Sequence, residues 1–245
     1  MRAMILAAGL GTRMRPLTEH TPKPLLEVGG MSLLEHHLQG LARAGFRDVV
    51  VNCSWLGEQI ISFCGDGSQW GLRIRISSEL EPLETAGGIV QALPWLAEDD
   101  AAFLVLNGDI YCPYPFAQLK QHQPESGGAH LVLVPNPPQH PDGDFRLEKS
   151  GRVAISASSG VASVSSESAA SDISAQTATF SGMAVYHPAF FAGCGKDVGP
   201  MRPLLDRAIE NGLVTGELWQ GYWEDVGTPA RLYRLRDTLG SAPIP

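Results

Sequence analysis

The hydrophobic and polar positions of the chain alternate between short apolar runs and longer segments in which apolar residues recur every three or four positions. Runs of the first kind are typical of strands and segments of the second kind of helices. The predicted strands are Ala3–Ala8, Asp48–Asn52, Arg73–Ser77, Ala102–Asn107 and Ala129–Pro135. The predicted helices are Ser32–Ala44, Glu58–Phe63, Gly88–Leu93 and Phe116–His122. Such alternation favours a three-layer α/β/α fold around a mostly parallel sheet.

The pattern changes after Asn136, where prolines and a glycine interrupt it. Asp144–Leu147 and Val153–Ile155 then predict a small antiparallel lid. Residues 156–176 are rich in Ser and Ala and nearly free of large apolar side chains, so we expect a flexible loop there. Further elements are predicted as a strand over Thr179–Tyr186, a helix over Met201–Asn211, a strand over Tyr222–Asp225 and a helix over Pro229–Leu239.

Composition narrows the class of protein. With 245 residues, 44% of them hydrophobic, the chain is expected to form one domain, residues 1–245. The net charge of −8 argues against a nucleic-acid partner, and no apolar stretch is long enough to predict a membrane span. The first strand begins directly after Arg2, which leaves no room for a signal peptide. Four widely spaced cysteines suggest buried thiols in a reducing cytoplasm.

The loop after the first predicted strand has the character of a phosphate-binding loop. It contains Gly9 and Gly11, whose small size leaves backbone N–H groups accessible to phosphate oxygens. A dinucleotide fingerprint would require glycine where Met14 stands, and the Gly-Lys-Ser/Thr of a P-loop is absent. Arg13 offers several donors to a phosphate, and Lys23, between two prolines, offers a compact charge. The alternative is a glycine turn with surface cations.

Two further segments place acidic residues near predicted strand ends. Asp109 follows an apolar strand and Asp225 ends another, and two such carboxylates suit an octahedral Mg²⁺. Alternatively, Asp109 stabilises a turn and Asp225 is an ordinary acid before a helix. Glu79 lies in a third segment, where it either accepts a hydrogen bond from a base or belongs to a solvated acidic face. The histidines show no metal-ligand spacing that pairs with a carboxylate, so we predict structural or exposed roles for them.

The first loop, with its Gly-x-Gly-Thr-Arg-x-x-Pro-Leu-Thr and the following Pro-Lys-Pro, resembles that of the sugar-1-phosphate nucleotidyltransferases. The resemblance implies their Rossmann-like fold, with a nucleotide-binding half (1–135) and a sugar-phosphate-binding half (136–245). It implies that Arg13 holds the departing pyrophosphate, that Lys23 contacts phosphate at the reacting centre and that Asp109 and Asp225 bind Mg²⁺. The nucleotide-binding positions that follow from it are Ala8, Gly9, Gly11, Thr12, Glu79, Leu83, Thr85 and Asn107.

The acceptor half departs from the commoner family pattern, because the Glu-Lys-Pro whose lysine grips the sugar phosphate is missing. In its place, the segments around Asp144 and Ser181 resemble those of N-acetylmuramate 1-phosphate uridylyltransferases of peptidoglycan recycling. This resemblance implies UTP and N-acetylmuramic acid α-1-phosphate as substrates. Arg146 or Arg202 would pair with the lactyl carboxylate or replace the lysine. The predicted acceptor-site residues are Asp144, Arg146, Ser181, Gly182 and Arg202.

Other functions remain open from the sequence alone. Glu-Pro-Leu-x-Thr-Ala-Gly also resembles mannose-1-phosphate guanylyltransferases, and a glucose-1-phosphate thymidylyltransferase or uridylyltransferase is a related alternative. From a different class, the chain could be a non-catalytic nucleotide-sugar sensor of the same fold. The presence of Arg13, Lys23, Asp109 and Asp225 argues against a sensor, which could dispense with them. We expect a monomer or a small homo-oligomer.

Overall fold

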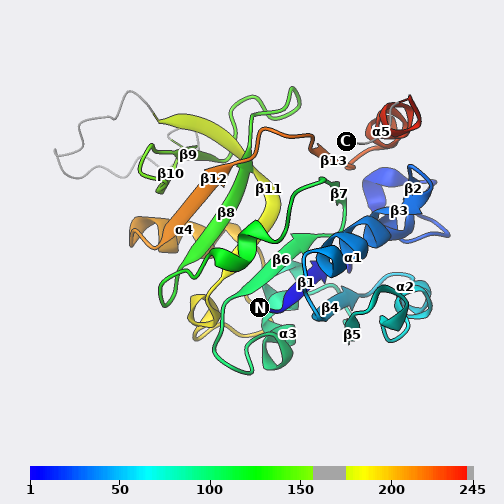
Figure 1. The fold of residues 1–245 in the computed structure, drawn as a ribbon, viewed down its shortest axis with the longest axis horizontal. Helices are drawn as coiled ribbons and strands as arrows, with labels where there is room; N and C mark the ends of the chain where they lie inside the picture. The colour runs from blue at the N-terminus through cyan, green and yellow to red at the C-terminus, as the bar shows by residue number, and fades with distance from the viewer. Residues whose placement is uncertain (157–174, 242–245) are drawn as a thin grey trace.

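A mixed sheet of nine strands forms the centre of the protein in the computed structural model, which describes residues 1–156 and 175–241 (Figure 1). Its strands are β1 (Ala3–Leu6), β4 (Asp48–Cys53), β5 (Arg73–Ser78), β6 (Phe103–Asn107), β8 (Ala129–Val134), β9 (Phe145–Leu147), β10 (Val153–Ile155), β11 (Gln176–Tyr186) and β12 (Val214–Leu218). Two short ladders accompany it, β2 (Glu27–Val28) with β3 (Met31–Ser32) and β7 (Ile110–Tyr111) with β13 (Glu224–Asp225). The predicted loop 156–176 lies almost wholly outside the described residues.

The strand directions bring several carboxyl ends to one edge of the sheet. Strands β5, β4, β1 and β6 are parallel neighbours, in register through pairs such as Ile5 with Val51 and Leu106. Strand β11 runs antiparallel to both β6 and β8, and β12 runs parallel to β8. The loop after β1 and the polar residues at the ends of β4 and β6 therefore gather at one edge, where ligands of open α/β sheets bind.

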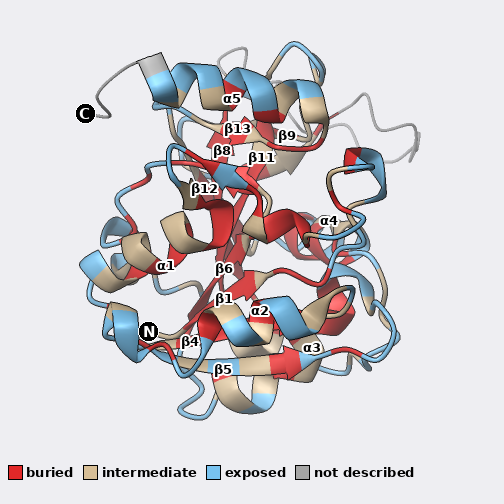
Figure 2. Ribbon diagram, turned by 90° about the vertical axis from the view of Figure 1, so that its right-hand side faces the viewer, coloured by how far each residue is buried: buried red, intermediate tan, exposed pale blue. Residues whose placement is uncertain are grey.

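Helices cover both faces of the sheet, as predicted (Figure 2). They are α1 (Leu33–Arg43), α2 (Gly57–Cys64), α3 (Glu84–Leu96), α4 (Arg202–Glu210) and α5 (Pro229–Ser241). Side chains of α1 and α2 pack with Ile5 and Val51 in one hydrophobic cluster, whereas α3 and α4 pack with Met4 and Val50 in the other. Because alternate residues of a strand point to opposite faces, apolar strands buried on both sides produce this division. The three-layer α/β/α prediction is confirmed.

Helix α5 lies apart from these layers and forms a third hydrophobic cluster with the first loop (Figure 1). Its Leu232 and Leu235 are fully buried against residues that include Met14, Tyr111 and Val226. The β7–β13 ladder belongs to the same region. This packing fixes the C-terminal segment that contains Asp225 beside the loop that contains Arg13.

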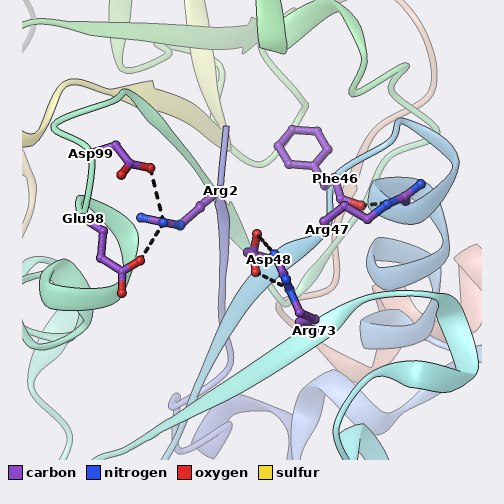
Figure 3. A network of polar contacts seen from close by, with 7 residues as sticks. All are labelled: Arg2, Phe46, Arg47, Asp48, Arg73, Glu98 and Asp99. Carbon is purple, nitrogen blue, oxygen red and sulfur yellow. Dashed lines mark hydrogen bonds and ion pairs between the residues drawn. The ribbon is translucent and has the colours of Figure 1, made fainter.

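Exposed ion pairs connect the elements at the amino ends of the parallel strands, opposite the hollow-bearing carboxyl ends (Figure 3). Arg2 contacts Glu98 and Asp99, and Arg73 forms a bidentate pair with Asp48 at 2.8 Å for each bond. These residues lie at the amino ends of β1, β4 and β5 and after α3, away from the carboxyl ends. Exposed pairs of this kind stabilise a fold by little, because water screens the charges and ordering two long side chains costs entropy.

Several predicted elements differ from those observed. Phe116–His122 is not an α-helix, since only a 3-10 turn forms over Gln118–Gln121; a segment this short between two prolines cannot propagate a helix. Helix α3 begins at Glu84 rather than Gly88, because the glycines of its first turns are buried against neighbours that tertiary packing supplies. The predicted lid strands form, but they pair through β9 with β11 and thus extend the main sheet. Strand β12 was not predicted.

Candidate active site

A hollow with a volume of about 540 Å³ lies where β1, β4 and β6 end. The loop after β1 forms one wall, and the predicted residues Ala8, Gly9, Gly11 and Thr12 all line it. Glu79 and Thr85 line the opposite side, and Arg13, Lys23, Asn107 and Asp109 line the remainder. The hollow therefore collects main-chain donors, cations and carboxylates in one place.

The glycine-rich loop is held in position by two hydrogen bonds. The backbone N–H of Ala7 donates to Asn52 Oδ1 at 2.7 Å, and the Thr18 hydroxyl donates to the Gly11 carbonyl at 2.7 Å. Gly11 adopts φ +61°, and a Cβ there would lie 3.0 Å from Thr18 Cγ2. Glycine is thus required at this position by both backbone conformation and space. A loop fixed in this way presents its N–H groups without further ordering.

A buried carboxylate organises the other wall. Glu79 is 6% exposed and accepts hydrogen bonds from Asn52 Nδ2 at 2.7 Å and from the Leu83 backbone N–H at 3.0 Å. Glu79 therefore positions Asn52 and the start of α3, while it also faces the hollow. Leu83 makes this backbone contact and does not line the hollow, whereas Glu84, at φ +59°, and Thr85 do.

Lys23 is the buried cation of the site. It sits in a 3-10 turn after Pro22, its side chain is 10% exposed, and its Nζ lies 2.5 Å from Asp109 Oδ2. Arg13 lies in the preceding 3-10 turn, is exposed, and lines the same hollow. The predicted cations thus face the predicted carboxylate from the two turns that follow β1.

Asp225 lies beside Asp109 through the β7–β13 ladder. Asp225 pairs with Ile110, and the Val226 backbone N–H donates to the Asp109 carbonyl at 3.0 Å. The Arg231 guanidinium donates to Asp225 Oδ2 at 2.7 Å. Both aspartate side chains are about one-third exposed and line a hollow of about 300 Å³. Within the described chain, neither Oδ1 accepts a hydrogen bond, so both remain available to a hard cation such as Mg²⁺.

A third hollow, of about 310 Å³, opens between β6, β9, α3 and α4. Asp144, Gly182 and Arg202 line it together with apolar side chains. Arg202 lies over the Phe145 ring at 4.9 Å and forms an ion pair with Asp206 at 2.7 Å. Asp144 accepts a hydrogen bond from the Phe180 backbone N–H at 2.8 Å and so holds β9 to β11. Asn107 lines all three hollows and marks their junction.

The predicted residues do not all reach these hollows. Arg146 lines none of them: Phe145, its neighbour on β9, lines the third hollow, and adjacent strand residues face opposite sides. Ser181 is fully buried and lines the hollow of the two aspartates. Asn52 and Arg231 were missed. Asn52 ends a predicted strand, the same signal that identified Asp109, whereas the pairing of Arg231 with Asp225 depends on the packing of α5.

No helix among the described residues is both long enough and apolar enough to pass through a membrane.

Comparison with known proteins gives a consistent result. A family model described as nucleotidyl transferase matches residues 2–155. A relative from Neisseria meningitidis serogroup B, named N-acetylmuramate alpha-1-phosphate uridylyltransferase, is 43% identical over 248 residues, which cover 98% of this chain and 99% of the relative. A mannose-1-phosphate guanyltransferase from Emericella nidulans is 40% identical over 135 residues, covering 55% of this chain and 37% of that protein. The fold is similar to that of a Bacillus anthracis protein assigned as a glucose-1-phosphate thymidylyltransferase, with a TM-score of 0.77, 18% identity and coverage of 100% and 97% of the two chains.

Proposed function

The chain belongs to the nucleotidyl transferase family, and from this premise we propose that it transfers a uridylyl group from UTP to N-acetylmuramic acid α-1-phosphate, giving UDP-N-acetylmuramic acid and pyrophosphate. The observation that carries the proposal is the junction of three hollows at Asn107, with Lys23, Arg13 and two aspartates around it. The muramate assignment draws on the Neisseria relative, whose similarity extends through the acceptor half. The guanyltransferase match covers little more than half of the chain.

The main barrier to the reaction is the repulsion between two negatively charged substrates, not the generation of a nucleophile. A sugar phosphate oxygen is already ionised at neutral pH, so attack on the α-phosphorus needs no general base. However, each pair of unit charges about 4 Å apart repels by roughly 4 kcal/mol at an effective dielectric near 20. Fixed cations that face the reacting phosphates offset this repulsion without reorganising during the reaction.

Each cation of the site has a role that follows from its position. Lys23, buried and close to the loop after β1, would stabilise charge on the α-phosphoryl oxygens. Arg13 is exposed and lies between the first hollow and that of the aspartates, so it would accompany pyrophosphate outward. Asp109 and Asp225 would hold Mg²⁺, which supplies Lewis-acid neutralisation of phosphate charge when bound.

The acceptor would occupy the third hollow. Arg202 is the cation that lines it, and this placement favours Arg202 over Arg146 as the partner of the lactyl carboxylate or of the sugar phosphate. The apolar side chains of the same hollow suit the faces of a sugar ring. We place the reaction in the cytoplasm, since the cysteines are unpaired and three of them are buried.

A substrate panel tests the proposal. Pyrophosphate release is measured with UTP, GTP and dTTP against the 1-phosphates of N-acetylmuramic acid, N-acetylglucosamine, mannose and glucose. We expect UTP with the muramate to give the highest kcat/KM. Preference for GTP with mannose 1-phosphate would establish the guanylyltransferase alternative. Activity that is lost with EDTA and restored by Mg²⁺ is expected, and binding without turnover under any condition would identify a sensor.

The acceptor assignment has its own variant pair. Arg202→Ala should raise KM for the muramate 1-phosphate about 10- to 100-fold, the loss that corresponds to one hydrogen bond to a charged group. Arg146→Ala is the matched control, because Arg146 lines none of the hollows. Equal KM values in the two variants would contradict the role of Arg202.

A further inference from the structure

Two histidines and a glutamate meet on a part of the sheet that the proposed reaction does not use. His122 follows the 3-10 turn Gln118–Gln121, His130 is the second residue of β8, and Glu217 belongs to β12. None of the three lines the hollows described above. The sequence did not suggest this group, because Glu217 lies far along the chain from the two histidines.

The ligand atoms of the three side chains converge. Glu217 Oε2 lies 3.5 Å from His122 Nε2 and 3.7 Å from His130 Nε2, and all three ligand atoms lie within 4.8 Å of one another. In a tetrahedral zinc site with bonds near 2.0–2.1 Å, neighbouring ligand atoms are about 3.3–3.4 Å apart. The distances from Glu217 to the two imidazoles are therefore close to those between ligands of one zinc ion.

A ring nitrogen of His130 is buried without a hydrogen-bond partner among the described residues, as expected of a metal ligand. The residue is 6% exposed, and its Nδ1 lies 2.9 Å from the Thr215 hydroxyl. Its Nε2 is buried and has no hydrogen-bond partner. If Nδ1–H donates to Thr215, Nε2 carries a lone pair that faces Glu217 and His122. A hydrogen bond to the remote nitrogen is the usual way in which proteins fix a metal-binding tautomer.

A neighbouring tyrosine also orients the Glu217 carboxylate. The Tyr114 hydroxyl donates to Glu217 Oε1, which directs Oε2 toward the histidines. Glu217 Oε2 is thus held on the side where the two imidazole nitrogens lie, 3.5 Å from His122 Nε2 and 3.7 Å from His130 Nε2.

We propose that His122, His130 and Glu217 form a binding site for a divalent transition metal of the zinc class, separate from the catalytic aspartates. Two imidazoles and a carboxylate suit zinc, whereas Mg²⁺ prefers oxygen ligands alone. The two imidazole rings are stacked, with centroids 3.6 Å apart and planes 12° from parallel. The lone pairs of two stacked rings lie in parallel planes and cannot both point at one ion, so one ring must rotate. The His122 side chain is 33% exposed and is therefore free to rotate.

An ion at this position would cross-link the connection between β7 and β8 to β12. Its role would therefore be structural, and nucleotidyl transfer should not require it. Because β12 leads through Trp219 and Trp223 to Asp225, the ion would stabilise the segment that delivers this aspartate. This role predicts higher resistance to unfolding with metal and unchanged kcat at low temperature.

The test uses the full chain stripped with EDTA and dialysed. Co²⁺ is titrated while visible absorption is recorded, and Zn²⁺ binding is measured by calorimetry. We expect one site with tetrahedral Co²⁺ absorption. The variants His122→Gln, His130→Gln and Glu217→Gln should each weaken Zn²⁺ affinity by at least about 10-fold, and Tyr114→Phe by about 10-fold through loss of the carboxylate partner. Each variant should retain Mg²⁺-dependent turnover.

Two controls separate this site from other metal-binding groups. His20→Gln changes an exposed histidine outside the cluster and should leave Zn²⁺ affinity unchanged. A double variant of Asp109 and Asp225 to Asn should abolish turnover yet retain the Co²⁺ spectrum. Absence of tetrahedral Co²⁺ absorption overturns the proposal, as does Zn²⁺ affinity that His122→Gln leaves intact. His122 is partly exposed, so this variant is not expected to disturb folding.

Discussion

At the residue scale, Lys23 is distinguished by how little freedom its charge has. Prolines flank it on both sides, its side chain is 10% exposed, and Asp109 holds its Nζ at 2.5 Å. A flexible surface lysine would lose conformational entropy each time it met a phosphate. Lys23 has already lost that entropy on folding, so its charge is preorganised for the transition state.

Replacing Lys23 by Met tests this preorganisation. We expect kcat/KM for pyrophosphate release to fall about 10²- to 10³-fold, the usual effect of losing one preorganised donor. Folding should persist, because the Asp109 side chain is about one-third exposed and water can solvate it. Lys149→Met is the control, since Lys149 is exposed and lies outside the hollows. A loss below 10-fold would show that Lys23 only pairs with Asp109.

At the scale of elements, the start of α3 and the wall of the hollow that contains Glu79 depend on each other. The helix begins at Glu84 with a positive φ, and its early residues Gly87 and Gly88 are buried. Glycine in a helix costs about 1 kcal/mol relative to alanine. Here the cost is offset because glycine leaves room for the buried hydrogen bond between Asn52 and Glu79. A Cβ on Gly88 would lie 2.7 Å from Glu79 Oε1 and 2.9 Å from Asn52 Nδ2.

Gly88→Ala therefore has two opposing effects on stability: alanine favours the helix, but its methyl group disturbs the buried hydrogen bond between Asn52 and Glu79. The added methyl must separate Glu79 from Asn52 or shift the helix, and a buried polar group left without its partner costs about 1–3 kcal/mol. We expect the free energy of unfolding in urea to fall by about 1–2 kcal/mol and KM for the nucleotide to rise. Gly240→Ala is the matched control: a Cβ at this helical glycine meets nothing within 4 Å, so stability should hold or increase.

The elements that the sequence predicts well are those whose own residues determine them. The strands β1, β4, β6 and β8 are mostly apolar on both faces, and β5 alternates arginine with isoleucine. Ser32, the first residue of a predicted helix, caps α1 by accepting a hydrogen bond from the Glu35 N–H. Strand β12 was missed because its Val-Thr-Gly-Glu-Leu is not an apolar run; pairing with β8 supplies its stability. The two-residue strand β7 likewise exists only as the partner of β13, which covers the end of the predicted strand Tyr222–Asp225.

The same distinction applies to the site. The glycine-rich loop, Lys23 and Asp109 were predicted because they belong to local motifs at strand ends, and the structure brings them together. The partner of Asp225, Arg231, and the cluster of His122, His130 and Glu217 arise from segments far apart in sequence, which no local pattern connects. Such contacts follow from tertiary packing, and a single sequence does not reveal it.

At the scale of the whole molecule, the charges at the two edges of the sheet have different uses. At the amino edge, exposed acids and arginines neutralise one another in pairs. At the carboxyl edge, Lys23, Arg13 and Arg202 face hollows, in a chain whose net charge is −8. These cations lie among acids such as Glu79 and Asp109, so they can bind small anions individually, while the net negative charge of the protein repels polyanions.

Stability of the whole molecule should depend on pH through His37. This residue of α1 is 2% exposed, and its Nε2 has no hydrogen-bond partner among the described residues. Burial, followed by the nearby charge of His36, lowers the pKa of His37 from 6.5 to about 4. Between these values the unfolded chain binds more protons than the folded one. The free energy of unfolding should therefore decrease as the pH falls from about 7 to 4, by up to about 3 kcal/mol from this residue.

His37→Gln should flatten this dependence, because glutamine takes up no proton in the range. Urea unfolding measured at intervals between pH 7 and 4.5 gives the slope, which is independent of any constant loss of stability in the variant. Part of the slope should survive, since burial lowers the pKa of His122 as well and acts in the same direction. His20→Gln, at an exposed histidine, should retain the full slope. If His37→Gln and the parent protein show the same slope, the charge of His37 is accommodated in the folded state, and its burial is not what limits stability in acid.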